Sequence, residues 1–353
     1  MITYYEIQKA VLAKFGKNIS DASKFLTDYD LVKRYINNIQ EMVYEYNMSW
    51  MKKEGMITLK AKYTTSTITV VNGSSTITGA TSVWTVDMVG QLIVISGVAY
   101  RIAGFTSTTS LTLDSPYIGT GASGLSYAIY YDTYDLPIDF KTLEYIGSEN
   151  QYLNVLKEDD TRYYLDSIKT TSGIPDYYKF LIKNEAMYST GTCTANTTTI
   201  TGTGTAWDSS LVGKYIQIGT YGKLYKITAA SATSITINEN YGGTITSTMN
   251  YKIQPQGLMS IRFYYAPTTA HKIPFIYCQK SIPLYDDTDI STIPSDSILI
   301  DGGIWCFSKA DDNSLRVSNI STDRFKIDFA ERLSRLESIN IYSEQNSTVD
   351  YHE

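Results

Sequence analysis

The start of the chain carries hydrophobic residues at the spacing of an amphipathic helix. Ile7, Val11 and Phe15 recur at four-residue intervals, which places their side chains on one helix face. Thr3–Glu6 has the spacing of a capping box, and Gly16 supplies a stop. The pattern predicts a short helix between these signals.

A second helical pattern follows after a polar interval. A box at Thr27–Asp30 opens it, and Gly55 marks its expected end. The predicted apolar face consists of Leu31, Tyr35, Ile36, Ile39, Met42, Val43 and Tyr46. Both helices therefore need a surface to cover their apolar faces.

The far end of the chain returns to a helical pattern. Pro294–Asp296 is a helix start, followed by an apolar stretch with Ile298, Leu299, Trp305 and Phe307. A second helical repeat, which extends to about Ile339, consists of Phe325, Phe329, Leu333 and Leu336. Residues 342–353 have no periodicity and are expected to be a mobile tail. We predict that the helices of both ends pack together as one domain, with Ile39 and Val43 facing Phe325 and Phe329.

Between the ends, the hydrophobic period changes to two and a long segment occurs twice. Residues 77–84 (ITGATSVW) reappear as residues 200–207 (ITGTGTAW), and the match continues to Tyr127 and Tyr251 with an offset between 123 and 125. Such short strands with frequent turns are typical of a small sandwich or barrel. We predict two copies of one β-module that superpose with both tryptophans buried.

This pattern leads to an α+β fold class. The predicted architecture is a helical domain built from the N- and C-terminal helices, into which two repeated small β-sandwich or β-barrel modules are inserted. The expected parts are a helical domain with associated strands (residues 1–62 and 257–353), module 1 (63–131), a connecting acidic segment (132–187) and module 2 (188–256). The connecting segment has eleven acids and six bases, so we expect it to be solvated.

Composition narrows the function classes. The 353 residues carry a net charge of -6, which disfavours a generic nucleic-acid or anionic-membrane binder, although residues 1–62 have ten bases and seven acids. The 31 tyrosines suit cores and protein interfaces. Cys193, Cys278 and Cys306 are interpreted as small buried hydrophobes, not as a disulfide or metal framework. With no signal peptide or transmembrane-length stretch, we expect synthesis in a reducing cytosol.

Candidate catalytic and metal-binding residues are few. The only histidines are His271 and His352, and His271 has no recognisable nucleophile elbow nearby. The acidic run Asp286–Asp289 lacks the glycine and distal glutamate of a calcium loop, so a solvated turn is the simpler interpretation. Paired carboxylates can cleave glycosides, and Glu158–Asp160 and Asp311-Asp312 are the acidic candidates. Acids that are adjacent in sequence do not normally face one substrate, so we interpret both as charged loops.

Two further patterns have a structural and a functional interpretation. Gly302-Gly303 is not followed by the Lys-Ser/Thr of a phosphate loop, so close helix packing explains it better. Trp84 and Trp207 could stack on sugars, but their equivalent module positions favour a repeated core plug. We therefore predict no enzyme, no catalytic or cofactor-binding residue, no metal site and no cofactor.

The order of several short motifs resembles the head-to-tail adaptor proteins of short-tailed bacteriophages. The N-terminal helix runs from about Asp30 into Trp50 and a strand. Further along stand Tyr134–Phe140 (YDLPIDF) and Gly173–Tyr177 (GIPDY), similar to the Tyr-x-Leu-Pro-x-Asp-Phe and Gly-x-Pro-x-Tyr elements of that family. The resemblance continues through the strand Ile261–Tyr265, the acidic turn Leu284–Asp289, and Ile293-Pro294 leading into Leu299–Trp305 and a charged last helix.

The resemblance covers about half of the chain and implies a structural virion protein of the phage neck, made in the host bacterial cytoplasm. It implies a cyclic homo-oligomer, a dodecamer in that family, that joins the portal protein to other tail or connector proteins. Genomic DNA would pass through it without specific binding, and no membrane would be involved. The two β-modules depart from the simple family pattern. The alternative interpretation is a glycan- or receptor-binding phage tail protein that uses these modules.

Overall fold

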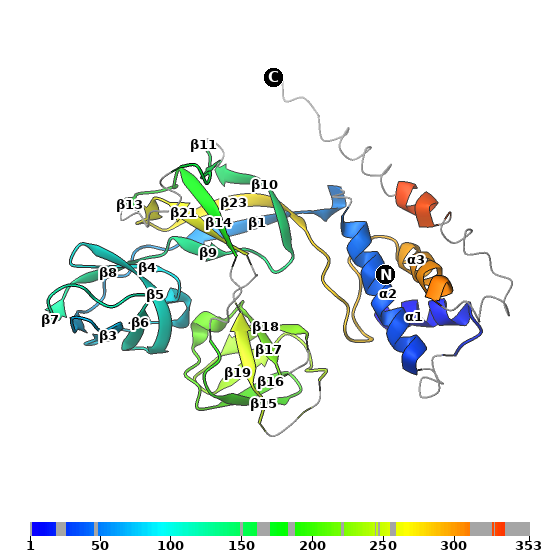
Figure 1. Cartoon of the computed structure of the whole chain (residues 1–353), viewed down its shortest axis with the longest axis horizontal. Coiled ribbons are helices and arrows are strands. Elements are labelled where there is room, and N and C mark those ends of the chain that lie inside the picture. Colours follow the sequence, from blue (N-terminus) through cyan, green and yellow to red (C-terminus); the bar gives the residue numbers. More distant parts are fainter. Residues whose placement is uncertain are drawn as a thin grey trace, which may run out of the picture. The chain divides into compact units, whose positions relative to one another are not determined.

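The computed structural model describes residues 2–18, 26–45, 49–148, 151–160, 170–182, 188–219, 222–243, 245, 248–254, 259–310, 327 and 329–335. The fold is mostly β, with 41% strand and 20% helix (Figure 1). The chain divides into two compact units: Met1–Lys53 with Tyr277–Glu353, and Glu54–Ile276. We call them the helical unit and the β unit.

The helical unit begins with α1 (Tyr4–Ala13), the helix that the capping-box pattern predicts. The Glu6 N–H donates to Thr3 Oγ1, and the Thr3 N–H donates to the Glu6 carboxylate at 2.7 Å. These bonds satisfy two N–H groups that the helix itself leaves without partners. Gly16 has a φ of 68°, a left-handed conformation that suits glycine. Both predicted end signals are confirmed.

The second helix, α2 (Leu26–Tyr44), is shorter than its sequence pattern predicts. Its first two residues, Leu26 and Thr27, are already helical, so the predicted start at Thr27–Asp30 is wrong. The chain continues through the 3-10 turn η2 (Ser49–Met51) into the strand β1 (Lys52–Leu59). Gly55 lies within this strand, where a Cβ would come within 2.2 Å of the Phe275 ring. This glycine therefore permits close packing of a strand and does not end a helix.

The third helix, α3 (Asp296–Ala310), packs on α1 and α2. A Cβ on Gly302 would lie 2.7 Å from the Ile39 side chain, and one on Gly303 would lie 3.0 Å from Val11. The glycine pair thus allows close helix packing, as the sequence analysis predicts. One buried apolar cluster includes Ile39, Val43 and Phe329, so the predicted packing of both chain ends into one domain is confirmed for these residues, while Phe325 lies outside the described residues.

The β unit contains a group of small sheets, which we call the β-scaffold. Its two four-stranded sheets have the orders β1-β23-β10-β11 and β12-β14-β21-β9, and β13 and β22 form a two-stranded sheet. The bounds are β9 (Thr133–Asp135), β10 (Phe140–Ser148), β11 (Gln151–Tyr152), β12 (Asn154–Val155), β13 (Thr170–Thr171), β14 (Tyr177–Ile182), β21 (Met259–Tyr264), β22 (Ala266–Pro267) and β23 (His271–Gln279).

Module 1 is a seven-stranded sheet with the order β7-β2-β3-β6-β5-β4-β8, shown in cyan in Figure 1. An isolated bridge between Tyr63 and Ile129 adds to the pairing. The module comprises β2 (Ile68–Val70), β3 (Thr76–Gly79), η3 (Val86–Met88), β4 (Leu92–Ile95), β5 (Val98–Ser107), β6 (Ser110–Leu113), β7 (Ala122–Leu125) and β8 (Tyr127–Tyr130).

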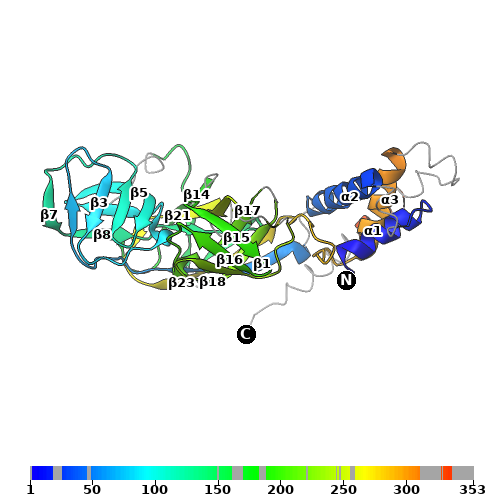
Figure 2. The same ribbon diagram turned by 90° about the horizontal axis from the view of Figure 1, so that it is seen from below.

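Module 2 repeats this arrangement with a six-stranded sheet of order β15-β16-β19-β18-β17-β20 (Figure 2). It comprises β15 (Thr192–Asn196), β16 (Thr199–Thr203), η5 (Ser209–Leu211), β17 (Tyr215–Ile218), β18 (Leu224–Ala230), β19 (Ser234–Ile237) and β20 (Tyr251–Gln254). The bridge between Tyr188 and Ile253 matches that between Tyr63 and Ile129, and the bridge between Cys193 and Met249 matches the β2–β7 pairing of module 1. The predicted common topology is confirmed.

The predicted fold class is wrong. The protein is not a helical domain that carries inserted β-modules, because strands outnumber helices and form several sheets, one of them a nearly closed barrel. The strands of residues 133–182 and 259–279, which the sequence analysis assigned to a solvated segment and to the helical domain, pair with one another in the β-scaffold. Pairing between segments so far apart leaves only weak local signals, because each strand is short.

The acidic segment that starts at residue 132 is also less solvated than expected. The side chains of Asp132, Asp135 and Asp139 are largely buried, with the first two in ion pairs to Arg101 and Lys214. Charge counting placed these carboxylates in water because it could not identify their partners.

Candidate functional site

The described residues with catalytic potential lie at exposed positions of different elements. The His271 side chain is exposed at the start of β23, and Glu158 and Asp159 are exposed in the turn after β12. Asp311-Asp312 and His352 lie outside the described residues.

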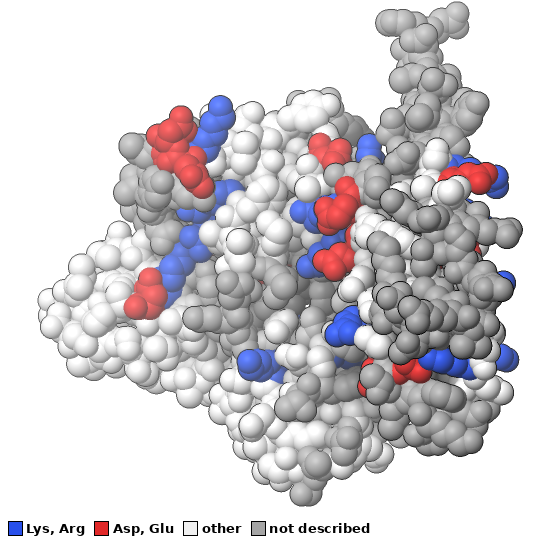
Figure 3. Space-filling model, turned by 45° about the vertical axis from the view of Figure 1, so that its right-hand side comes forward, with Lys and Arg blue, Asp and Glu red and all other residues white. Residues whose placement is uncertain are grey.

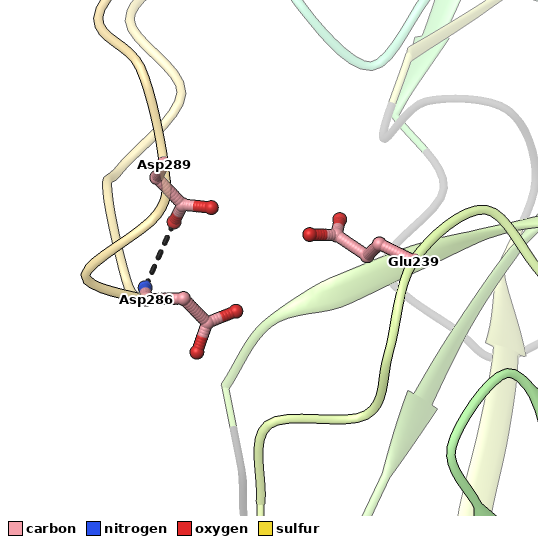
Figure 4. A group of neighbouring side chains, drawn as sticks. All are labelled: Glu239, Asp286 and Asp289. Carbon is pink, nitrogen blue, oxygen red and sulfur yellow. Dashed lines mark hydrogen bonds between the residues drawn. The ribbon is translucent and has the colours of Figure 1, made fainter. Parts of the chain in front are cut away.

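The acidic run Asp286–Asp289 forms a turn within the helical unit. One carboxylate oxygen of Asp289 accepts the N–H groups of Tyr285 and Asp286, at 2.7 and 2.9 Å. Figure 4 shows the second of these bonds. The backbone carbonyls of Asp289 and Asp287 accept the N–H groups of Tyr4 and Tyr5 at the start of α1. The turn therefore satisfies helix N–H groups through its backbone.

Side chains of α2 also engage this turn. The Tyr29 hydroxyl donates to Asp287 at 3.0 Å, and Lys33 Nζ lies 3.3 Å from the same carboxylate. Burial and the hydrogen bond to Asp287 raise the pKa of the Tyr29 hydroxyl. The third acid drawn in Figure 4, Glu239, belongs to the β unit, where it forms an ion pair with Lys223 at 2.7 Å. The turn thus acts as a structural support for α1 and α2.

The two tryptophans are core residues, as predicted. Trp84 is 0% exposed and Trp207 is 3% exposed. Each indole N–H donates to a tyrosine hydroxyl of its own module, Trp84 to Tyr127 at 2.9 Å and Trp207 to Tyr251 at 3.0 Å. With the ring inside the core and its donor satisfied, neither indole offers a face for sugar stacking.

The hydrogen bonds around each tryptophan also repeat. The Tyr127 hydroxyl donates to the Thr65 carbonyl, and the Tyr251 hydroxyl donates to the Thr190 carbonyl. Backbone N–H groups also donate to two further pairs of equivalent tyrosine hydroxyls: Tyr63 with Tyr188, and Tyr100 with Tyr225. The high tyrosine content therefore has a structural role, since these hydroxyls satisfy backbone groups at the module edges.

The segment Tyr134–Phe140 connects the two larger sheets of the β-scaffold. It starts in β9, turns through a bond from the Phe140 N–H to the Pro137 carbonyl, and enters β10. The Tyr134 ring lies 5.7 Å from that of Phe263 in β21, and its hydroxyl accepts the Lys60 N–H at 2.9 Å. Burial raises the pKa of this hydroxyl.

The segment Gly173–Tyr177 leads into the sheet that contains β9. Gly173 has a φ of 91° and donates its N–H to Thr269 Oγ1 at 2.9 Å. Tyr177 then starts β14, which pairs antiparallel with β21 along its whole length. Both motifs therefore build the β-scaffold, and neither lies in a module.

Sequence reasoning missed two largely buried ion pairs next to β9. Arg101 contacts Asp132 in a bidentate pair at 2.7 and 2.8 Å, and Lys214 lies 2.7 Å from Asp135. One signal was available, because Arg101 is one of three charged residues in module 1. An isolated charge in such a segment predicts a specific partner, but the partner itself cannot be read from the local pattern.

The interpretation of the cysteines as small buried hydrophobes is confirmed for Cys193 and Cys278 but not for Cys306. None of the three forms a disulfide; Cys193 and Cys278 are buried, and Cys306 is half-buried. Burial raises the pKa of the Cys193 thiol to about 11. Within the described residues, no helix is long and apolar enough to cross a membrane.

Comparisons with known proteins give little information about identity. No family model matches the chain, and no curated protein matches it. Among solved structures, one match is the translation elongation factor SelB from Methanococcus maripaludis in its apo form, with 9% identity and a TM-score of 0.15. The match covers 60% of this chain and 63% of that chain. At this TM-score, the likeness supports no conclusion about fold or function.

Proposed function

We propose that this chain is a structural connector of a phage virion, a head-to-tail adaptor that assembles into a cyclic ring between the portal and the tail. In this proposal the protein has no catalytic turnover. It contacts the portal protein on one side and other tail or connector proteins on the other, and the ring forms part of the DNA conduit.

The observation that carries the proposal is the place of the resemblance motifs in the fold. Tyr134–Phe140 and Gly173–Tyr177 build the β-scaffold. Leu284–Asp289 supports α1, and Gly302-Gly303 lets α3 pack on α1 and α2. Segments spread over about 170 residues thus build parts of the frameworks of both units, and these parts are what a connector family would share.

The surface charge is consistent with a conduit. The net charge of -6 opposes strong binding to DNA phosphates, because such binding depends on Lys and Arg contacts. Figure 3 shows acidic and basic side chains near one another within a larger uncharged surface.

The burial of both indoles argues against the alternative, a glycan binder that stacks sugars on Trp84 and Trp207.

The connector proposal places the portal contact in the helical unit, especially in residues 321–340 and the tail 342–353. Most of these residues lie outside the described part of the chain.

Mass measurement tests this proposal. The purified chain is measured alone and after mixing with a portal ring, by native mass spectrometry or mass photometry. We expect a closed homo-oligomer on the portal, and deletion of residues 342–353 to weaken that complex while the fold remains. A chain that stays monomeric with the portal and binds host polysaccharide instead would contradict the connector function.

A further inference from the structure

Both modules meet the β-scaffold at the same strand, β9, through the same position of the internal repeat. Gln91 of module 1 and Lys214 of module 2 are equivalent, since each directly follows the glycine of a Val-Gly pair. Their backbones are also equivalent. The carbonyl of Gln91 accepts the Ile102 N–H at 3.1 Å, and that of Lys214 accepts the Ile227 N–H at 2.9 Å.

In module 1, this position carries an amide whose hydrogen bonds reach the scaffold backbone. Gln91 Nε2 donates to the Thr133 carbonyl at 2.7 Å, and Gln91 Oε1 accepts the N–H groups of Asp132 and Thr133 at 3.1 and 3.2 Å. The Gln91 side chain is buried. The Gln91 amide therefore binds the backbone at the start of β9 directly, and this contact requires no charge.

In module 2, the same position carries a charge. Lys214 Nζ lies 2.7 Å from one carboxylate oxygen of Asp135, whose other oxygen accepts the Ser260 hydroxyl at 3.2 Å. The two side chains are 17% and 7% exposed. Burial, together with the charge of Asp139, raises the pKa of the neighbouring Tyr215.

We infer that β9 is a common support for both modules and that the Lys214–Asp135 ion pair fixes the orientation of module 2 on the β-scaffold. A largely buried ion pair contributes little net stability, but separation of its members leaves a charge without compensation. The pair therefore favours one orientation over others in which the module is equally well folded. This role is independent of portal binding and goes beyond the proposed connector function.

A comparison of the two copies supplies a matched control. Arg101 of module 1, which pairs with Asp132 of the connecting segment, is equivalent to Lys226 of module 2. Lys226 is exposed on β18, with the same charge and length as Lys214. Removal of the Lys226 charge should therefore leave the orientation of module 2 unchanged.

The experiment measures a distance between module 2 and the β-scaffold in the full chain. Spin labels are attached at Ala229→Cys on β18 and Val155→Cys on β12, both exposed, in a Cys306→Ser background. Double electron–electron resonance should give one narrow distance distribution. We expect Lys214→Met to broaden or shift it and Lys226→Met to leave it unchanged.

A charge exchange keeps the test decisive if Lys214→Met unfolds module 2. Lys214→Glu alone should displace the distribution, and the double variant Lys214→Glu/Asp135→Lys should restore it. Fluorescence of the buried Trp207 reports whether module 2 stays folded. An unchanged distribution in a folded Lys214→Met variant would overturn the inference. If Lys214→Met is unfolded, failure of the double variant Lys214→Glu/Asp135→Lys to restore the original distance would also overturn the inference.

Discussion

At the scale of single residues, tyrosine hydroxyls connect the core of each module to its edges. Tyr127 shows the arrangement, because its hydroxyl accepts the Trp84 indole N–H and donates to the Thr65 carbonyl. Tyr251 makes the corresponding two bonds in module 2. A buried donor that loses its partner destabilises the fold by more than the net value of one hydrogen bond.

Tyr127→Phe and Tyr251→Phe should therefore have similar effects. Each change leaves a buried indole N–H without its acceptor, which should lower the free energy of unfolding by about 1–3 kcal/mol. Urea denaturation followed by tryptophan fluorescence measures the loss. Tyr152→Phe is the control, since Tyr152 is 74% exposed. A loss for only one of the two buried positions would show that the copies differ in energetics despite their equal geometry.

The same hydroxyl predicts an alkaline effect. Burial is the main cause that raises the pKa of Tyr127 from 10.0 to about 12. Because the folded state favours the neutral hydroxyl, its stabilising contribution is complete below about pH 10 and is lost as the pH rises through about 12. Urea midpoints across this range should fall less steeply for Tyr127→Phe than for the unchanged protein. Equal slopes would show that other tyrosines account for the alkaline loss.

At the scale of elements, the helical unit depends on how closely α3 approaches α2. Gly302 faces Ile39, and a Cβ at that position would lie 2.7 Å from the isoleucine side chain. Ile39 is fully buried, so it has little space into which to move. Overpacked cores lose about 1–3 kcal/mol because side chains and backbone must shift.

Gly302→Ala should therefore destabilise the helical unit by an amount in this range, and Ile39→Ala by about 2–5 kcal/mol. The double variant should lose less than the sum, because the smaller side chain makes room for the new methyl group. Thermal unfolding monitored by helical circular dichroism gives the three values. Strict additivity would mean that the two residues do not meet in solution.

At the scale of the whole molecule, module 2 lies between two strands that are already paired. Ile182 at the end of β14 is the register partner of Met259 at the start of β21. The two chain ends of the module therefore leave the β-scaffold at adjacent positions. A short hairpin turn can join antiparallel partners of this kind.

Replacement of residues 183–258 by Asn-Gly should thus leave the β-scaffold, module 1 and the helical unit folded. Asp135→Asn is included, so that no carboxylate is left without Lys214. Circular dichroism and the cooperativity of thermal unfolding measure the outcome, with the Asp135→Asn full chain as the control. Aggregation or loss of the cooperative transition would show that the scaffold needs module 2 to fold.

The sequence alone determined the features that depend on neighbours in the chain. The capping box at Thr3 and Glu6 and the start of α3 follow from local spacing, because a helix turn is complete within a few residues. The two equivalent modules with buried tryptophans follow from the internal repeat, which the sequence shows directly. Tertiary structure decided where α2 ends, that Gly55 lies in a strand, and that Asp132 and Asp135 are buried in ion pairs. These outcomes depend on partners far away in the chain. Short strands and single charges acquire their environment only when distant segments meet, which is also why the mostly β fold was not predicted.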